Sequence, residues 1–269
     1  MDKCDIFDFM SKYVGLTVLH PGGLKATQRL AETCGVNEGS LVLDLGCGKG
    51  TSAIYLAEHF GCKVQGIDIS QDSINHAQLL AGRKNLEDRV SFRTGDALHL
   101  PFDDGQFDVV VSQALLVLVP NKAKVVREAL RVAKPSGRVG WLELSWKETP
   151  PQSFMKEVSE VICAYCMLNV ETFQGWETLF RTQGTQELNT NKRKMEFNGL
   201  REMLHDEGVH NSLRIIRRYL TNGQIRRRMR RTARFFHDNP QYFGYGIYVG
   251  SSPPLITEKP LLIPPITAG

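Results

Sequence analysis

The chain has 269 residues, of which 42% are hydrophobic and 23% are charged, and its formal net charge is +4. These values are ordinary for a globular protein with a sizeable core, and so small a charge gives no reason by itself to expect nucleic acid or a membrane as partner. No stretch approaches the roughly 18 apolar residues that a membrane span needs, and the beginning of the chain lacks the pattern of a secretory signal. We therefore expect a cytoplasmic protein.

The cysteines agree with this compartment. Six of them are scattered along the chain, which favours reduced thiols over a disulfide framework. Cys163 and Cys166 form a C-x-x-C pair, but neither a second pair nor neighbouring histidines accompany it. We expect two core residues there, and we predict no metal site.

Residues 1–40 are predicted to form a helical N-terminal segment. Apolar residues recur at roughly helical spacing over 5–19, and a second helical pattern covers 24–34. Pro21 and the glycines beside it separate the two patterns.

A strand, a glycine-rich turn, a helix and a second strand are predicted over residues 41–68. The first strand contains one carboxylate, Asp44, and the second strand ends in Asp68. Three glycines stand at alternate positions of the turn: Gly46, Gly48 and Gly50. A hydroxyl of Thr51 or Ser52 suits the N-cap of the helix. The unit is typical of a nucleotide-type site at the carboxyl edge of a parallel sheet, where glycine lets a ligand lie against the backbone.

The spacing of this turn indicates which ligand of this type fits. A dinucleotide fingerprint would need a glycine where the chain has Thr51. Asp44, two residues before the first glycine, repels a pyrophosphate and attracts an ammonium group. S-adenosylmethionine carries an ammonium and a sulfonium but no phosphate, so the residues favour it over an NAD-type ligand. A glycine-rich turn that binds nothing is the other alternative.

Three more strands complete the predicted core, and each has a polar residue at or just beyond its carboxyl end. These residues are Asp96, Gln113 and Glu143. The strands are predicted at 89–94, 107–112 and 138–144, with helices at 71–82 and 122–133.

Residues 41–144 resemble the class I S-adenosylmethionine-dependent methyltransferases, most closely the branch of ubiquinone/menaquinone C-methyltransferases and small-molecule N- and O-methyltransferases. The glycine-rich turn, the acids at the strand ends and the Pro-Phe-x-x-x-x-Phe-Asp arrangement from Pro101 carry the resemblance. It implies S-adenosyl-L-methionine as cofactor and S-adenosyl-L-homocysteine as product. It also implies an α/β Rossmann-like fold: a seven-stranded, mostly parallel sheet with an antiparallel last strand, helices on both faces and a helical cap.

The resemblance also implies roles for the site residues. Asp44 would meet the ammonium group of the cofactor, Asp68 the ribose hydroxyls, and Asp96 the adenine amino group. The backbone N–H of Ala97 would reach a ring nitrogen, and Ile69 would cover one face of the ring. The predicted cofactor-binding residues are Asp44, Gly46, Cys47, Gly48, Gly50, Asp68, Ile69, Asp96, Ala97 and Gln113.

Three residues are catalytic candidates on the acceptor side of the site. Tyr13 and His20 belong to the N-terminal segment, which in related methyltransferases lies over the cofactor. Glu143 interrupts an apolar strand and can orient a substrate or act as a base. Each has a structural alternative: an ordinary packed tyrosine, a histidine in a turn, and a salt bridge at the exit of the strand.

Beyond residue 150 the chain departs from a minimal core of this kind. Helices are predicted at 154–170 and 176–181, and strands at 186–197 and 243–251. The predicted organisation is an N-terminal segment (1–40), a cofactor-binding core (41–150), the rest of the core with a helical substrate-cap insertion at about 198–240 (151–251), and a proline-rich tail (252–269).

The insertion holds a strong charge asymmetry, with ten arginines against four acidic residues over 198–240. One predicted helix is rich in arginine but has four apolar residues on a single face: Ile225, Met229, Ala233 and Phe236. Such a helix can dock on the core and present guanidinium groups outward. A solvated face, an anionic substrate, peripheral membrane contact through 224–236, and RNA are the open explanations.

We expect a methyltransferase that acts by in-line displacement on a small-molecule acceptor, of anionic or lipid/quinone-like chemistry. Methylation of nucleic-acid amino groups is disfavoured, because the residues after the fourth strand, 112–115, lack an Asn-Pro-Pro-Tyr type motif. The alternatives are a non-catalytic scaffold, a methyltransferase of RNA or protein, and arsenic methylation through Cys62, Cys163 and Cys166. The sequence predicts neither the acceptor atom nor the oligomeric state.

Overall fold

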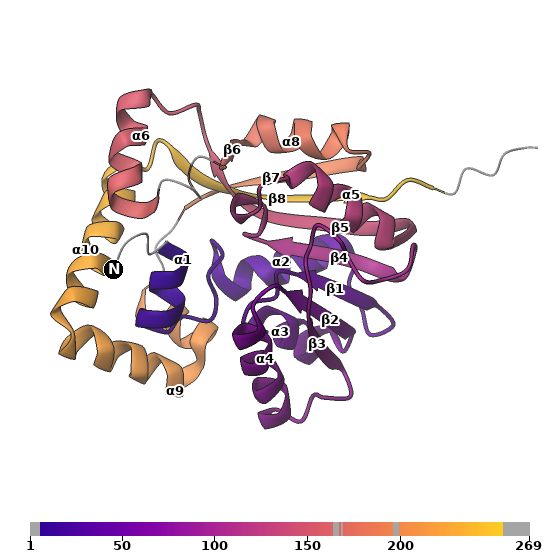
Figure 1. The fold of residues 1–269 in the computed structure, drawn as a ribbon, viewed down its shortest axis with the longest axis horizontal. Coiled ribbons are helices and arrows are strands. Elements are labelled where there is room, and N and C mark those ends of the chain that lie inside the picture. Colours follow the sequence, from indigo (N-terminus) through magenta and orange to yellow (C-terminus); the bar gives the residue numbers. More distant parts are fainter. Residues whose placement is uncertain (1–5, 164–166, 168, 196–198, 255–269) are drawn as a thin grey trace, which may run out of the picture.

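The computed structural model describes most of the chain, and residues 1–5, 164–166, 168, 196–198 and 255–269 lie outside the described part. The side chain of Cys163, the whole of Cys166 and most of the predicted proline-rich tail therefore fall outside the description. A sheet covered by helices on both faces and a helical cap at one end make up the rest (Figure 1).

Eight strands form one mixed sheet with the spatial order β3-β2-β1-β4-β5-β8-β7, and the short β6 pairs with β5. The strands are β1 (Leu41–Leu45), β2 (Lys63–Asp68), β3 (Val90–Thr94), β4 (Phe107–Gln113), β5 (Ala133–Trp146), β6 (Glu171–Thr172), β7 (Gln186–Lys194) and β8 (Phe243–Ser251). Strands β1 to β5 pair in parallel, and β8 lies antiparallel between β5 and β7. The expected Rossmann-like fold with an antiparallel last strand is confirmed, and β6 is the strand that sequence analysis missed.

The sheet has an apolar layer on each face. Val110 packs in one layer, and its neighbours Val109 and Val111 pack in the other, as the two-residue period of a strand requires. Helices α5 (Lys122–Val132) and α8 (Phe173–Thr182) cover the first layer. Helices α2 (Gly23–Cys34), α3 (Thr51–Phe60) and α4 (Gln71–Arg83) cover the second. Burial on both faces explains why these strands read as continuous apolar runs.

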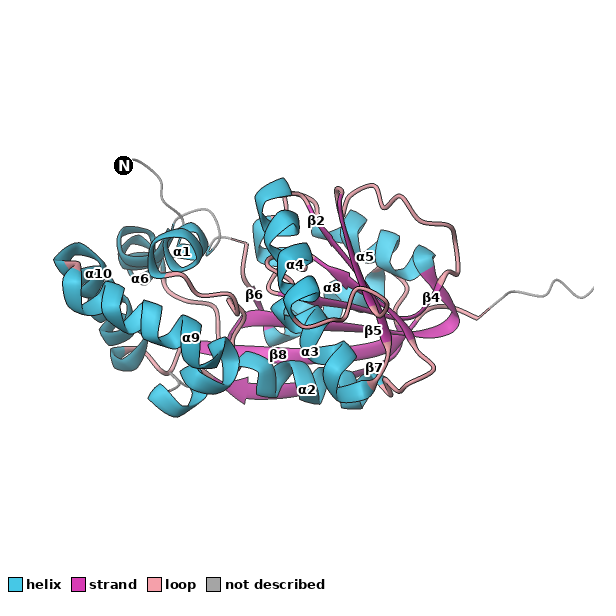
Figure 2. Cartoon of the chain, turned by 90° about the horizontal axis from the view of Figure 1, so that it is seen from below, coloured by secondary structure: helices cyan, strands magenta, loops and turns pink. Residues whose placement is uncertain are grey.

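The remaining helices form the cap at one end of the sheet (Figure 2). They are α1 (Ile6–Asp8) with the π-helical turn Phe9–Val14, α6 (Gln152–Val158), α9 (Leu200–Thr221) and α10 (Gly223–Asp238). Within α9 the backbone is not helical at Gly208 (φ 69°, ψ 167°), and Asn222 separates α9 from α10 and caps α10 with its side chain. Among the described residues, none of the helices has the length and apolar character needed to cross a bilayer.

Three local predictions are wrong. The hydroxyls of Thr51 and Ser52 do not cap α3, because the N-cap residue is a glycine and no side chain accepts a hydrogen bond there. Ala233 is exposed, since α10 turns two phenylalanines and a threonine toward the core instead. The α-helix predicted over 154–170 ends at Val158 and continues as a π-helical turn.

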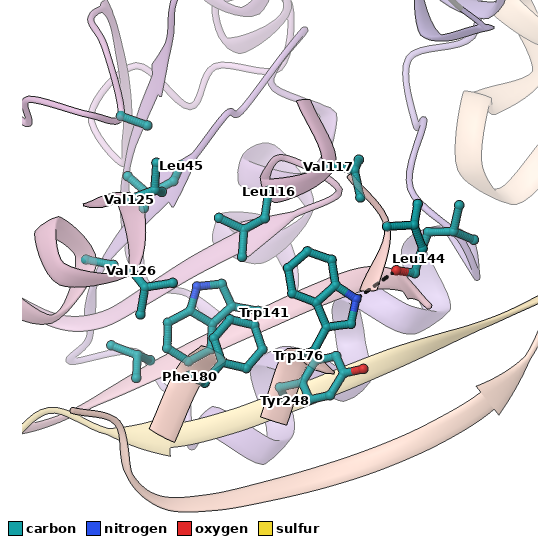
Figure 3. Packing of buried hydrophobic residues seen from close by; sticks show 14 of the residues in the cluster. Leu45, Leu116, Val117, Val125, Val126, Trp141, Leu144, Trp176, Phe180 and Tyr248 are labelled. Atoms are coloured by element: carbon teal, nitrogen blue, oxygen red, sulfur yellow. Dashed lines mark hydrogen bonds between the residues drawn. The ribbon is translucent and has the colours of Figure 1, made fainter. Parts of the chain in front are cut away.

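Aromatic side chains of α8 pack against aromatic side chains of β5 and β8 (Figure 3). Phe180 is fully buried, and its ring stacks on Trp141 with 4.2 Å between centroids. The ring of Tyr248 lies 5.2 Å away on β8. Trp176, also in contact with Phe180, donates its indole N–H to the carbonyl of Leu144 at 2.9 Å. These contacts fasten α8 to β5 and β8.

Replacing Phe180 by alanine should lower the free energy of unfolding by about 3 to 5 kcal/mol, because the surrounding rings cannot fill the cavity. Urea unfolding followed by circular dichroism measures the change. Leu79→Ala on α4 is the control: Leu79 is 64% exposed, and its loss should change the free energy by at most about 0.5 kcal/mol. Equal effects of the two substitutions would contradict this packing.

Candidate functional site

Three of the predicted acids end neighbouring strands at one edge of the sheet. Strands β1, β2 and β3 pair in parallel, with Asp44 opposite Gly66 and Asp68 opposite Thr94. Asp96 follows Thr94 two residues later. Since the carboxyl ends of adjacent parallel strands share an edge, the three acids line the same edge.

The glycine-rich turn after β1 combines a packed side with an open side. Gly46, Gly48 and Gly50 have φ values of 72°, 51° and 80°, which favour glycine. A Cβ on Gly50 would lie 2.7 Å from the Cβ of Ala77, so the contact with α4 leaves no room for a side chain. A Cβ on Gly48 would meet nothing within 4 Å. A ligand therefore has room along the backbone at Gly48.

Hydrogen bonds fix this turn to β2. The N–H groups of Gly46 and Cys47 both donate to the carbonyl of Ile67, at 2.8 and 3.1 Å. The N–H of Gly48 donates to Oδ2 of Asp68 at 2.9 Å, and the other oxygen of Asp68 accepts a backbone N–H two residues later. Both oxygens of this carboxylate are thus oriented, and each keeps a lone pair for a ligand hydroxyl.

Asp44 is a buried carboxyl group that lacks a full set of partners. It is 2% exposed, and its Oδ2 has no hydrogen-bond partner among the described residues. Burial, together with the charge of nearby Asp68, raises the pKa of Asp44 to about 7. An unpaired buried carboxylate is unfavourable, so a cationic ligand group would be bound here and would lower this pKa.

The edge beyond Asp68 offers a hydrogen-bond acceptor and an exposed apolar side chain. Asp96 is 46% exposed in its side chain, and its Oδ1 accepts the N–H of Leu98 at 2.9 Å. Ile69 is 77% exposed, the largest fraction among the large hydrophobic residues that the structure describes. Ala97 is buried beside Asp96. An acid and an open branched side chain at adjoining strand ends suit a flat ring that carries an amino group.

His20 and Gln113 belong to one hydrogen-bonded series. The hydroxyl of Thr27 donates to Oε1 of Gln113 at 2.8 Å, and its oxygen lies 3.2 Å from Nε2 of His20. The same Nε2 lies 3.2 Å from the hydroxyl oxygen of Ser52 on α3. Burial lowers the pKa of His20 to about 4, so the imidazole is neutral at pH 7. Nε2 of Gln113 is buried without a partner among the described residues, which leaves a donor for a ligand.

Glu143 on β5 holds the turn that follows β4. Its side chain is completely buried, and Oε1 accepts the N–H of Leu116 at 3.0 Å, at the start of the short helix Leu116–Leu118. Burial raises the pKa of Glu143 to about 8, so the group is mostly protonated at neutral pH. The salt bridge considered from the sequence is not found among the described residues, because a backbone N–H takes that place.

Tyr13 lies on the N-terminal segment with 45% of its surface exposed. Its ring stacks on Phe9 at 6.3 Å, and its carbonyl accepts a hydrogen bond from Arg218 at 3.2 Å. No described hydrogen bond joins its hydroxyl to His20 or Glu143. The structure therefore brings His20 next to the predicted cofactor residues but does not connect Tyr13 to them.

Sequence analysis missed the residues that hold the N-terminal segment. Lys49, inside the glycine-rich turn, donates to the carbonyls of Ser11 and Leu16 at 2.9 and 3.2 Å. Glu207 on α9 accepts the N–H and the hydroxyl of Thr17, both at 2.8 Å. Lys49 could have been noticed from the sequence, because it is the one charged residue in the glycine-rich turn. No pattern in the residues around Glu207 predicts its role. The segment is thus fastened both to the glycine-rich turn and to α9.

Comparison with known proteins shows the family of this chain. A family model described as a methyltransferase domain matches residues 37–198. An uncharacterized protein of Haemophilus influenzae is 30% identical over 227 residues, which cover 84% of this chain and 89% of that protein.

Two named relatives are similar over a shorter region. Norajmaline N-methyltransferase of Rauvolfia serpentina is 32% identical over 51% of this chain and 50% of its own length. The chloroplastic tocopherol O-methyltransferase of Arabidopsis thaliana is 41% identical over 45% of this chain and 36% of its own length. The chain therefore spans half or less of these two relatives.

Solved structures share the fold. Phosphoethanolamine N-methyltransferase 2 of Haemonchus contortus, in complex with phosphomonomethylethanolamine and S-adenosylhomocysteine, has a TM-score of 0.72 at 19% identity, over 92% of this chain and 57% of that chain. The [4+2]-cyclase SpnF has a TM-score of 0.69 at 20% identity, over 93% of each chain. Since one is a methyltransferase and the other a cyclase, the reaction has to be argued from the site.

Glu143→Gln should remove a pH dependence of stability. The pKa of this carboxyl is about 8 in the folded chain against an ordinary 4.5, so between these values the folded state holds a proton that the unfolded state has released. Relative to the variant, the wild type should lose on the order of 4 kcal/mol of unfolding free energy as the pH rises from about 5 to about 8.

Denaturant unfolding at several pH values measures this difference. Glu38→Gln, at an exposed position, is the control and should keep the wild-type pH dependence. Parallel curves for the wild type and Glu143→Gln would contradict the buried, protonated state of Glu143.

Proposed function

Because the chain belongs to the methyltransferase domain family, we propose that it transfers a methyl group from S-adenosyl-L-methionine to a small-molecule acceptor. The observation that carries the proposal is Asp44, a buried carboxyl group with an unpartnered oxygen beside the glycine-rich turn. A dinucleotide would bring a pyrophosphate against this acid, whereas S-adenosylmethionine brings an ammonium group. S-adenosyl-L-homocysteine would be the product.

The residues at the strand ends fit this cofactor in charge and in hydrogen-bonding chemistry. Asp44 would hold the ammonium group, Asp68 the ribose hydroxyls and Asp96 the adenine amino group. Gly48 leaves room along the backbone, and Ile69 offers an apolar cover for the ring. When bound, the cofactor supplies a methyl group that is already activated on a sulfonium.

The contribution of the chain is then to align the acceptor and to exclude water. The N-terminal segment, fastened by Lys49 and Glu207, would close the site from the cap side. The series from His20 through Thr27 to Gln113 would orient the methionine part of the cofactor, because Nε2 of Gln113 has a donor to spare.

The catalytic candidates differ in how well they suit proton transfer. Glu143 is protonated and bonded to backbone, so we assign it to positioning the turn after β4. His20 is neutral, but its Nε2 already contacts two hydroxyls. An acceptor whose nucleophilic atom carries a free lone pair would need no general base. For an acceptor that must lose a proton, His20 or Tyr13 would be the base.

Relatives whose names state an acceptor support a small organic molecule: norajmaline and tocopherol for two relatives in sequence, and phosphoethanolamine for a similar structure. An anionic or lipid/quinone-like acceptor, as expected from the sequence, stays a prediction. A protein that binds the cofactor without catalysis is the alternative.

Asp68→Asn should weaken binding of S-adenosyl-L-methionine by roughly tenfold to a hundredfold, because an amide offers one acceptor where the carboxylate offers two. Isothermal titration calorimetry measures the affinity. Asp72→Asn, at an exposed position in the first turn of α4, is the control and should bind like the wild type.

The wild type incubated with cofactor and a pool of small molecules should yield products heavier by one methyl group in mass spectrometry. Absence of cofactor binding would overturn the proposal. Binding without a methylated product would favour the non-catalytic alternative.

Cofactor binding should also release a proton near neutral pH, because the pKa of Asp44 is about 7 and a bound cation would lower it. The carboxyl must ionise to pair, so affinity should rise as the pH increases from about 6 to about 7.5. Calorimetry in buffers of different ionisation enthalpy counts the proton. Asp44→Asn should abolish the release and Asp72→Asn should keep it; an unchanged release in Asp44→Asn would contradict the assignment of the ammonium group.

A further inference from the structure

Helix α9 exposes a series of apolar side chains. Among the described residues, eight large hydrophobic side chains are exposed, and five of them belong to this helix. They are Leu200 (59% exposed), Leu204 (37%), Val209 (67%), Leu213 (61%) and Leu220 (64%). A single exposed leucine needs no explanation, but a series on one helix marks a surface that meets something apolar.

Part of this series follows one face of the helix. After the break at Gly208, three of its members lie four and seven positions apart: Val209, Leu213 and Leu220, here called the α9 stripe. The opposite face is bonded to the protein, since Ile215 is 2% exposed and Asn211 donates to the carbonyl of Gly15 at 3.0 Å. The stripe therefore points away from the fold and not into the cap.

Positive charge accompanies the stripe. Arg217 lies on α9 between Leu213 and Leu220, is exposed, and forms no ion pair among the described residues. From α10, Arg226 donates to the carbonyl of Leu220 at 2.9 Å and Arg230 donates to the hydroxyl of Tyr219 at 2.8 Å, so both guanidinium groups lie at the end of the stripe. The segment 198–240 has ten arginines against four acids. On α10, four of these arginines line a surface hollow of about 450 Å³ together with the acids Glu157 and Asp238: Arg227, Arg230, Arg231 and Arg234.

The sequence predicted an apolar face and an arginine-rich face on one helix, but the structure places them on two helices. The apolar residues of α10 are largely directed inward, because Ile225, Phe235 and Phe236 are buried, so this helix offers arginines but little apolar surface. Helix α9 offers the apolar surface. Membrane contact expected through 224–236 alone would thus lack an inserting face, and α9 would supply it.

We propose that the α9 stripe and the arginines beside it, Arg217, Arg226 and Arg230, form a docking surface for an anionic lipid bilayer. The apolar side chains would enter the boundary between headgroups and acyl chains, and the guanidinium groups would contact lipid phosphates. A second copy of the chain could also cover a leucine stripe, but pairing would bring two arginine-rich surfaces together. Charge complementarity therefore favours the anionic bilayer.

Cosedimentation with lipid vesicles tests the proposal on the full chain. The protein should pellet with phosphatidylcholine vesicles that contain about one-third phosphatidylglycerol, and much less with phosphatidylcholine alone. Raising NaCl from about 0.1 M to about 0.5 M should reduce the bound fraction, because salt screens the arginine–phosphate attraction.

Paired variants assign the effect to the stripe. Leu213→Ser combined with Leu220→Ser should weaken binding to the anionic vesicles by at least about tenfold, since two apolar side chains leave the bilayer. Leu79→Ser on α4 is the matched control, because Leu79 and Leu220 are each 64% exposed. Arg217→Gln should weaken binding and reduce its salt dependence, because one guanidinium group beside the stripe is removed. All variants should keep the circular dichroism spectrum and the thermal midpoint of the wild type, which shows that they are folded. Neither these controls nor cosedimentation depends on the proposed methyl transfer.

Three results would overturn the docking proposal. The first is a wild-type protein that does not pellet, and the second is a stripe variant that pellets like Leu79→Ser. The third is a dimer in sedimentation velocity that the leucine substitutions dissociate, which would assign the stripe to a second copy of the chain.

Discussion

A carboxyl group buried beside a second acid is the constraint on which the site depends. Asp44 and Asp68 lie close enough for the charge of one to raise the pKa of the other, and the N–H of Gly48 binds the second acid in place. A buried, ionised Asp44 opposes folding, and the two apolar layers of the sheet compensate. The ammonium group of the proposed cofactor would remove the conflict, so binding and folding would act on the same group.

Other unsatisfied groups occur at the same edge. Eight buried side-chain atoms of the described residues lack a hydrogen-bond partner, and five belong to β1, β4, β5 or the first turn of α3. They are in Asp44, Thr51, Ser112, Gln113 and Glu143. Native structures leave few buried polar atoms unpaired, and these five lie at the edge of the sheet where the proposed cofactor would bind.

The sequence predicted what depends on local pattern, and it could not predict what depends on distant contacts. Each core strand could be read from an apolar run with a polar residue at its end, so the sheet and the three acids were found. The bond from Glu207 to Thr17 spans 190 residues, and the role of Glu143 depends on a turn 27 residues earlier. The periodicity of the sequence likewise predicted an apolar face on α10. It could not predict which face of α9 is exposed, because that depends on the bonds between α9 and the N-terminal segment.

The place of β8 has a consequence for how the protein is made. This strand comes last in sequence among the described strands but lies between β5 and β7, and within the described sheet it is the sole neighbour of β7. During synthesis β5 keeps an open edge until residues 243–251 leave the ribosome, and β7 waits without a partner. A chain that lacked residues 243–251 would leave β7 unpaired and one edge of β5 exposed to aggregation, so the sheet closes only after β8 has been made.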